Sequence, residues 1–283
     1  MYIFVHFYFV LFIHSYFIIN TRSVYYYHKQ EKANSYKENN KKLDKMILEK
    51  YNESKGRYGS PKIQKELEKN GIKVSQKRVA RRMKILGIRS VIVKKYKPGP
   101  SKSKVDDTNK PNLLNQEFKA ERLREKLVSD ITYIYTKEIG WTYLAVVMDL
   151  YSLRVIGYSY GKSMDADLVI QAIENARKKG KFIENAIFHS DLGSQYTSNK
   201  VEEYLKGLKL RHSYSKKGYP YDNASMESFN AILKKEEVNL HEYETFEEAR
   251  RAIFEFIEGW YNRKRIHSSI DYKVPNEVEK EVA

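Results

Sequence analysis

Apolar residues recur with two different periods along the chain, and the change of period predicts two parts. Residues 39–93 show the three-to-four-residue spacing of amphipathic helices, whereas residues 121–283 begin with strand-like alternation and then mix both patterns. Residues 94–120 begin with a Pro-Gly-Pro turn and alternating Ser and Lys, which predicts a linker. We therefore expect an all-α domain followed by an α/β domain, in which helices flank a mixed sheet.

The helical part carries the start and stop signals of a helix-turn-helix. Ser60-Pro61 predicts the start of one helix, with Ser as the N-cap, and Asn70-Gly71 predicts its end. A second helix is expected over residues 75–86, where apolar residues recur at i, i+4 and i+7 behind a capping Ser. An earlier helix over about residues 42–51 would complete a three-helix unit.

The front of the second helix is lined by long hydrogen-bond donors. These are Gln76, Lys77, Arg78, Arg81 and Arg82. Such side chains suit contacts with phosphates and with guanine edges in the major groove of DNA, so we expect this to be a recognition helix. The alternative is an ordinary amphipathic hairpin with a solvated basic face.

The distribution of charge favours DNA binding. The chain has 283 residues, with 52 Lys and Arg against 36 Asp and Glu, a net charge of +16. Residues 39–104 alone hold 21 basic and 5 acidic groups, whereas residues 105–283 hold 27 and 29. A short basic module beside a nearly neutral domain is typical of a nucleic-acid-binding unit joined to something else.

The chain has no Cys, which excludes disulfides, thiolate nucleophiles and Cys-containing zinc sites and makes the cytoplasm the expected compartment.

Residues 1–20 form an apolar leader, and residues 21–38 connect it to the helical domain. The stretch 2–19 is aromatic and aliphatic apart from two His and one Ser, and it reaches the lower length limit of a membrane span, roughly 17 residues. It is a poor signal peptide, because no basic residue precedes it and no small-residue cleavage site follows. A membrane anchor that leaves the main body in the cytoplasm and a leader from an upstream start codon both remain open.

Alternating patterns define the α/β domain. Residues 127–135, 141–148 and 154–160 predict three antiparallel strands. The further elements expected are a helix over 165–179, a short buried strand over 186–189 and a helix over 224–236, which Asp222 or Asn223 can cap.

Three carboxylates occupy positions from which they can converge. Asp130 lies within the first strand, Asp191 directly follows the buried strand, and Glu227 lies in the helix, with 35 residues between it and Asp191. Clustered carboxylates repel one another unless cations neutralise them, and oxygen-only ligation is what Mg²⁺ or Mn²⁺ prefers. Two such ions can stabilise the attacking and leaving oxygens of an in-line displacement at a phosphodiester. Taken singly, each residue is more often a surface carboxylate, and Asp149 is a reserve candidate.

Four strings surround these residues in order: Ser-Asp-Ile-Thr-Tyr-Ile (129–134), His-Ser-Asp-Leu-Gly-Ser-Gln-Tyr (189–196), Asp-Asn-Ala-Ser-Met-Glu-Ser-Phe (222–229) and Tyr-Asn-Arg-Lys-Arg-Ile-His (261–267). Together they resemble the catalytic core of DDE-type bacterial insertion-sequence transposases, specifically the second-frame product of insertion-sequence family three, which is related to retroviral integrases. The resemblance implies an RNase H-like fold and Mg²⁺-dependent DNA cleavage and strand transfer by a polynucleotidyl transferase. It also implies that Asp130, Asp191 and Glu227 form the metal-binding triad, with two ions.

The same resemblance implies the partners. These are the terminal repeats of the element, target DNA, further copies of the chain and an upstream-frame protein as partner or fusion, without a small-molecule cofactor. Candidate DNA contacts in the core are Lys216, Lys217, Asn223, Lys234 and Arg265. For Lys234 the alternative is a solvated lysine, and for Arg265 it is a structural role. His189 is expected to be packed rather than a ligand.

Three positions depart from the family pattern. No Trp stands shortly before Asp130, Leu192 occupies a position where Arg commonly follows the second Asp, and Leu153 replaces the Arg of a Ser-Arg pair. Leu192 removes a cation beside a predicted metal ligand. A catalytically inactive helix-turn-helix protein derived from a transposase is therefore the alternative function.

Overall fold

The computed structural model of the protein describes residues 2–91, 110–216 and 221–282. The chain divides into two compact units, Met1–Val91 and Ile92–Ala283. The first is all-α and the second combines strands and helices, which confirms the predicted fold class.

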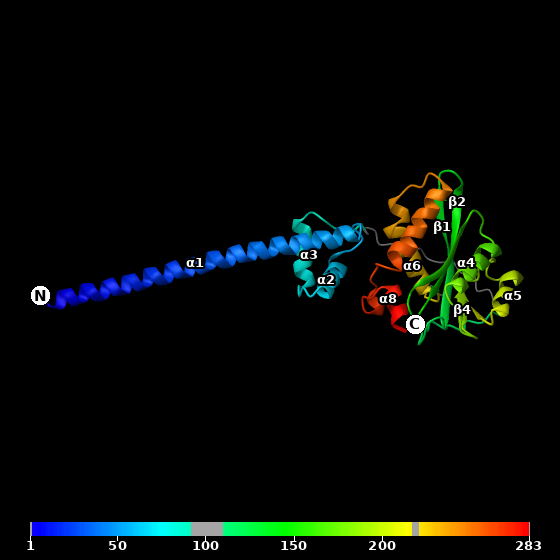
Figure 1. The fold of residues 1–283 in the computed structure, drawn as a ribbon, viewed down its shortest axis with the longest axis horizontal. Coiled ribbons are helices and arrows are strands. Elements are labelled where there is room, and N and C mark those ends of the chain that lie inside the picture. The colour runs from blue at the N-terminus through cyan, green and yellow to red at the C-terminus, as the bar shows by residue number, and fades with distance from the viewer. Residues whose placement is uncertain (1, 92–109, 217–220, 283) are drawn as a thin grey trace. The chain divides into compact units, whose positions relative to one another are not determined.

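The first unit contains α1 (Tyr2–Glu53), α2 (Ser60–Lys69) and α3 (Gln76–Ile85). Helices α2 and α3 pack against each other and against the C-terminal part of α1 (Figure 1). Their contact surface is apolar, because Ile47, Ile63 and Val79 are fully buried. The unit is thus held by one small core shared among the three helices.

Helix boundaries in this unit agree with the sequence in part. The hydroxyl of Ser75 accepts a hydrogen bond from the backbone N of Arg78 and caps α3, as predicted. The N-cap of α2 is Gly59 rather than Ser60. The helix expected over 42–51 is the end of α1, because residues 2–53 contain no Gly or Pro that would stop a helix earlier. Within the described ranges, no helix has a stretch apolar enough to cross a membrane.

The second unit is built on a five-stranded sheet with the order β3-β2-β1-β4-β5. Its strands are β1 (Lys126–Thr136), β2 (Gly140–Asp149), β3 (Val155–Gly161), β4 (Ile187–Ser190) and β5 (Arg211–Tyr214). The first three are antiparallel, as predicted, while β4 pairs parallel with β1 and β5 pairs parallel with β4. The sequence did not predict β5, because its four residues lack an apolar alternation.

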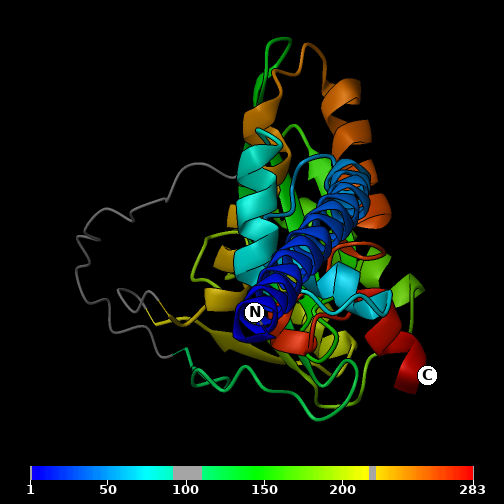
Figure 2. The same ribbon diagram turned by 90° about the vertical axis from the view of Figure 1, so that its left-hand side faces the viewer.

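Helices cover both faces of this sheet. They are α4 (Ala166–Lys178), α5 (Asn199–Gly207), α6 (Ala224–Glu236), α7 (Phe246–Phe254) with the π-helical continuation η2 (Glu255–Tyr261), and α8 (Pro275–Val282), with short 3₁₀ turns η1 (Val238–Leu240) and η3 (Ser268–Ile270). Helices α4 and α5 lie on one side of the sheet and α6 on the other (Figures 1 and 2). Because strand side chains alternate between faces, successive residues of β1 reach different helices.

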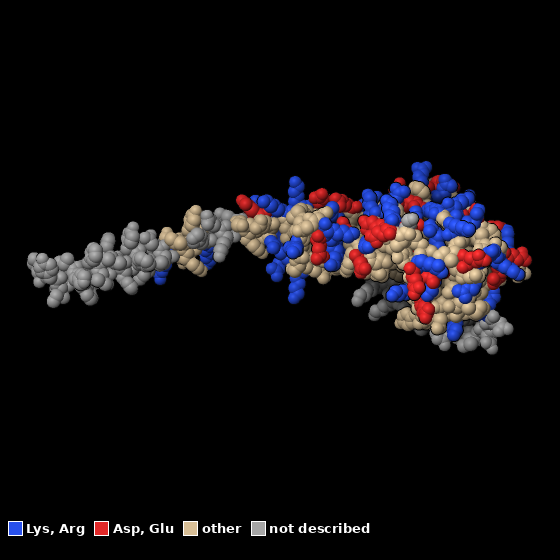
Figure 3. All heavy atoms as spheres, turned by 60° about the horizontal axis from the view of Figure 1, so that its bottom comes forward, with Lys and Arg blue, Asp and Glu red and all other residues tan. Residues whose placement is uncertain are grey.

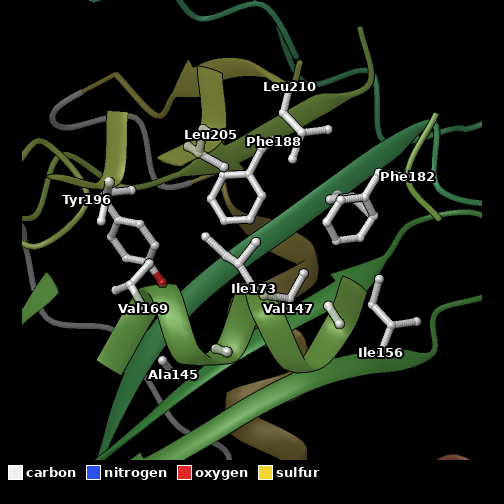
Figure 4. Packing of buried hydrophobic residues seen from close by; sticks show 14 of the residues in the cluster. Ala145, Val147, Ile156, Val169, Ile173, Phe182, Phe188, Tyr196, Leu205 and Leu210 are labelled. Carbon is white, nitrogen blue, oxygen red and sulfur yellow. The ribbon is translucent and has the colours of Figure 1, made fainter. Parts of the chain in front are cut away.

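The main core lies between the sheet and helices α4 and α5. Phe188 of β4 points toward Ile173 of α4, and Leu205 and Leu210 close the cluster (Figure 4). Helix α4 approaches β3 closely because Gly157 has no side chain. A Cβ atom at Gly157 would lie 2.3 Å from the carbonyl oxygen of Ala172 and 2.5 Å from the backbone N of Ala176.

Residues 110–120 differ from the sequence-based assignment to the linker, because they pack on the second unit. Leu114 is 1% exposed, and the backbone N atoms of Leu113 and Leu114 donate to the Ser213 hydroxyl at 2.8 and 3.0 Å. The apolar side chain of Leu114 gives this stretch a reason to dock despite its polar neighbours, whereas Leu113 stays exposed. Residues 92–109 of the expected linker lie outside the described residues.

We expect Gly157→Ala to lower the free energy of unfolding by about 2–3 kcal/mol, because the new methyl group must displace the α4 backbone. Gly207→Ala is the matched control, since no atom lies within 4 Å of a Cβ there. That control should be neutral or stabilise by about 0.5 kcal/mol. Urea unfolding of both variants tests this, and an unchanged midpoint for Gly157→Ala would contradict the close α4–β3 contact.

Candidate active site

The pairing of β1 with β4 brings two of the three predicted carboxylates together. The last residue pair of this parallel ladder is Val128 with His189. Asp130, within β1, and Asp191, the residue directly after β4, each lie two positions beyond this pair. Side chains two residues apart along a strand point to the same face of the sheet. This register therefore directs both carboxylates to one face, beside the C-terminal end of β4.

Glu227 is brought to Asp130 by α6, which lies on the face of the sheet away from α4 and α5 (Figures 1 and 2). It lies in the first turn of α6, which contacts β1. Asn230, one turn later on α6, donates through Nδ2 to Oδ2 of Asp130 at 2.8 Å. This bond ties α6 to β1 beside the carboxylates, and the sequence gave no indication of it beyond placing Asn230 and Glu227 on one helix face.

The electrostatics of Asp130 show that the carboxylates act on one another. Burial raises the pKa of Asp130 to about 7, and the charges of Asp191 and, more weakly, Glu227 contribute to this rise. Burial also raises the pKa of Asp191 and of Glu227. The three negative charges are therefore held in a region that disfavours them, as expected for a site completed by a cation.

Two amide oxygens add to the acceptors around Glu227. Oδ1 of Asn223 and Oδ1 of Asn230 are buried and have no hydrogen-bond partner among the residues that the structure describes. Glu227 and Asn230, spaced i and i+3, share one face of α6, and Asn223 is the N-cap residue of this helix. Carboxylate and amide oxygens are the ligands that Mg²⁺ or Mn²⁺ prefers, so the chemistry of these side chains, rather than their spacing, suits such an ion. Among the residues that the structure describes, no three His, Cys, Asp or Glu side chains lie close enough together to hold a metal ion.

The loop after β4 is fixed by two contacts. The backbone N of Gly193 donates to Oδ1 of Asp191 at 3.0 Å, which orients the carboxylate. The hydroxyl of Tyr196, a fully buried side chain, lies 2.7 Å from the hydroxyl of Ser129. Because Ser129 precedes Asp130, this bond holds the Asp191 loop against β1. Neither contact could be anticipated from spacing, since Tyr196 carries no chemical signal of its own.

Two other titratable residues near the motifs, His189 and Asp149, are buried and hydrogen-bonded within the fold. His189 is buried between the hydroxyls of Ser213 and Ser215, at 2.9 Å from Nδ1 and 3.0 Å from Nε2, and burial lowers its pKa to about 4. It is packed, as predicted. Asp149 is 1% exposed and accepts hydrogen bonds from Arg124 and Ser152, so it closes the turn after β2.

The predicted DNA contacts of the core fall in different surroundings. Lys216 is exposed and Lys234 is partly buried, whereas Asn223 is buried at the start of α6 and Lys217 lies outside the described residues. Arg265 is 7% exposed and pairs with Glu236, with Nη2 2.9 Å from Oε1. Trp260 donates to the same carboxylate at 2.9 Å. The structure thus places the Arg265 guanidinium inside the core, where it joins α6 to the C-terminal segment.

The predicted contacts of the helical unit also divide into two groups. Gln76, Lys77 and Arg81 are exposed on α3. Arg78 donates to Asn40 at 3.0 Å, and Arg82 forms a two-bond ion pair with Asp44, so both attach α3 to α1. Lys and Arg side chains project from several sides of this unit (Figure 3).

Comparisons with known proteins match both units. Residues 37–96 match the family described as HTH-like domain, and residues 120–220 and 208–275 match two families described as Integrase core domain. The transposase for insertion sequence element IS904 of Lactococcus lactis is 41% identical over 84% of this chain and 93% of its own length. Transposase InsF for insertion sequence IS3A of Escherichia coli is 39% identical over 80% of this chain and 77% of its own length.

Solved structures also resemble part of the chain. The catalytic core domain of HTLV-2 integrase, solved in complex with magnesium, matches 56% of this chain and 99% of its own with a TM-score of 0.42 at 18% identity. The intasome of simian T-cell lymphotropic virus matches 78% of this chain and 70% of its own with a TM-score of 0.44 at 14% identity.

The raised pKa of Asp130 predicts a pH-dependent effect of Asp130→Asn on stability. An unfolded Asp ionises near pH 3.9, whereas Asp130 in the folded chain ionises at about 7. Between these values the folded state retains a proton that the unfolded state releases, so this group costs stability as pH rises and the cost is complete above pH 7. Removing the charge should raise the free energy of unfolding at pH 8 by up to about 4 kcal/mol, and by less at pH 5.

Thermal unfolding of the wild type and of Asp130→Asn at pH 5 and pH 8, in EDTA, tests this. Asp167→Asn, which changes an exposed carboxylate on α4, is the control and should show the same small effect at both pH values. Addition of Mg²⁺ at pH 8 should raise the Tm of the wild type more than that of Asp130→Asn. A pH-independent difference would contradict the assignment.

Proposed function

The chain belongs to the transposases of bacterial insertion sequences that carry an integrase core, and from this we propose that Asp130, Asp191 and Glu227 are its catalytic carboxylates. The protein is a polynucleotidyl transferase with an RNase H-like core, and transposition recombines DNA.

The observation that carries the proposal is the register of β1 and β4. It sets Asp130 and Asp191 two residues beyond the same pair, and the Asn230–Asp130 bond brings the helix of Glu227 to them. The contribution of Asp191 and Glu227 to the raised pKa of Asp130 supports the convergence independently. An all-oxygen acceptor set of this charge is suited to divalent cations.

We propose two Mg²⁺ or Mn²⁺ ions as the cofactor, held by the three carboxylates. Such ions, when bound, neutralise the phosphate and favour ionisation of the attacking hydroxyl. The protein residues supply position: Asn230 holds the Asp130 carboxylate, and the backbone N of Gly193 holds that of Asp191. Water then attacks a phosphorus atom to free a 3′-hydroxyl, which attacks a phosphorus of target DNA. One P–O bond forms and one breaks in each step, without a covalent protein intermediate.

We further propose that the HTH-like unit recognises the terminal repeats through the exposed side chains of Gln76, Lys77 and Arg81. Pairing two DNA ends requires at least two copies of the chain, and an upstream-frame protein is a candidate partner. The cytoplasm, where the DNA lies, suits a chain without Cys.

Glu227→Gln is expected to lower strand transfer into a plasmid, in the presence of Mg²⁺, by roughly 100-fold or more, because it removes a ligand charge. Its folding and its binding to DNA ends should not change, since Glu227 is exposed in the first turn of α6. Glu203→Gln, an exposed substitution on α5, is the matched control. Equal activity of the wild type and Glu227→Gln would exclude the assigned triad, and an inactive wild type that still binds DNA would favour the decayed-transposase alternative.

Arg81→Ala should weaken binding to the terminal repeats and reduce the slope of log K against log salt by about 1, as expected when one phosphate contact is lost. Its Tm should stay near that of the wild type. Arg82→Ala should instead lower the Tm, because Arg82 pairs with Asp44. Binding isotherms at several salt concentrations check the first effect, and an unchanged slope for Arg81→Ala would remove this residue from the interface.

A further inference from the structure

Residues 110–116, the lead-in segment, bring the chain into the second unit along the outer edge of β5. The backbone N of Tyr214 donates to the carbonyl of Pro111 at 3.0 Å, and two backbone N atoms of the segment donate to the Ser213 hydroxyl. Lys110 lies 3.3 Å from Oε1 of Glu202. The segment is therefore a fixed part of the core edge and is bonded to it through backbone and side chains.

The lead-in segment also reaches the start of the helix that carries Glu227. Asp222, which is 2% exposed, accepts a hydrogen bond from Nδ2 of Asn112 at 2.9 Å and from Nε2 of Gln116 at 2.8 Å. Its third donor is the backbone N of Lys216, at 2.8 Å. A buried carboxylate is stable only when donors compensate its charge, and two of these three donors belong to the lead-in segment.

Helix α6 has little local support for its first turn. Asn223 occupies the N-cap position, but its side chain makes no capping hydrogen bond. By contrast, α3, α4, α5 and α7 each begin with a side-chain cap. A missing cap leaves the first backbone N atoms of a helix without their usual partner, so the start of α6 depends on contacts with other parts of the fold.

We propose that Asp222 is a positioning residue through which the lead-in segment sets the placement of Glu227. Glu227 lies between two anchors: Asp222, five residues before it, is bonded to the lead-in segment, and Asn230, three residues after it, is bonded to Asp130. The first turn of α6 is thus fixed at both ends by bonds to distant parts of the chain. The inference rests on the proposed catalytic role of Glu227, which Asp222 serves without contacting DNA or metal itself.

The donors of Asp222 link the start of α6 to the chain that precedes the core. Asn112 and Gln116 belong to the stretch that continues from the helical unit into the core. Whatever alters the seating of this stretch alters the donors of Asp222, and hence the start of α6. Residues 110–116 thereby contribute to the geometry of the proposed active site.

Two variants of the full chain test the proposal by hydrogen–deuterium exchange in EDTA. Asp222→Asn removes the charge, and the double variant Asn112→Ala/Gln116→Ala removes the donors and leaves Asp222 in place. In both, backbone amides of residues 224–230 should exchange roughly tenfold faster than in the wild type. Lys110→Gln is the matched control, because it removes a lead-in contact with Glu202 and leaves the bonds of Asp222 intact. Its exchange in residues 224–230 should match the wild type.

Strand-transfer kinetics supply the second readout. The two test variants should lose roughly tenfold or more in kcat, with KM for the DNA ends unchanged, because a misplaced Glu227 affects the chemical step. Wild-type exchange over residues 224–230 in both variants would overturn the proposal, and if Asp222→Asn fails to fold the double variant decides. Full activity of Glu227→Gln would instead refute the proposed function, and the metal-free exchange result would still stand.

Discussion

The parallel pairing of β1 with β4 is the contact on which the rest of the active site depends. The β1–β2–β3 meander can form from neighbouring residues, but a parallel strand requires a crossover, which α4 provides while covering the sheet. Only when Phe188 is buried against α4 does β4 lie beside β1 with the register that sets Asp191 next to Asp130. The apolar core and the placement of the two proposed catalytic aspartates are therefore two results of one packing arrangement.

This arrangement holds charges together at a cost in stability. The fold places Asp130 where both burial and its neighbours oppose ionisation, and it compensates with well-packed faces and with bonds such as Asn230 to Asp130. A protein selected for stability alone would replace one of these carboxylates. Their raised pKa values, with two amide oxygens that have no partner among the described residues, support the proposed site for a cation.

Much of the fold and the site could be predicted from the sequence where local signals are strong. The meander, α4, α6 and the Ser75 cap follow from alternation, helical spacing and cap chemistry, whereas the triad rests on the family resemblance and stays a prediction. Other features depend on partners far along the chain. The burial of Arg265 needs Glu236, the docking of Leu114 needs Ser213, and β5 is a strand only because β4 offers it an edge. The full length of α1 was not predicted. The apolar character of residues 2–19 suggests a membrane span or a leader, whereas the length of the helix follows from its lack of helix stops.

The order of elements along the chain has a consequence for synthesis. The helical unit ends at Val91, whereas the carboxylate set is complete only with α6, more than a hundred residues later. A product that terminates early, through a stop codon or a frameshift ahead of residue 224, would keep all three helices of the first unit and lack Glu227. On the roles proposed above, such a fragment would bind the same DNA without cutting it and would compete with the intact enzyme.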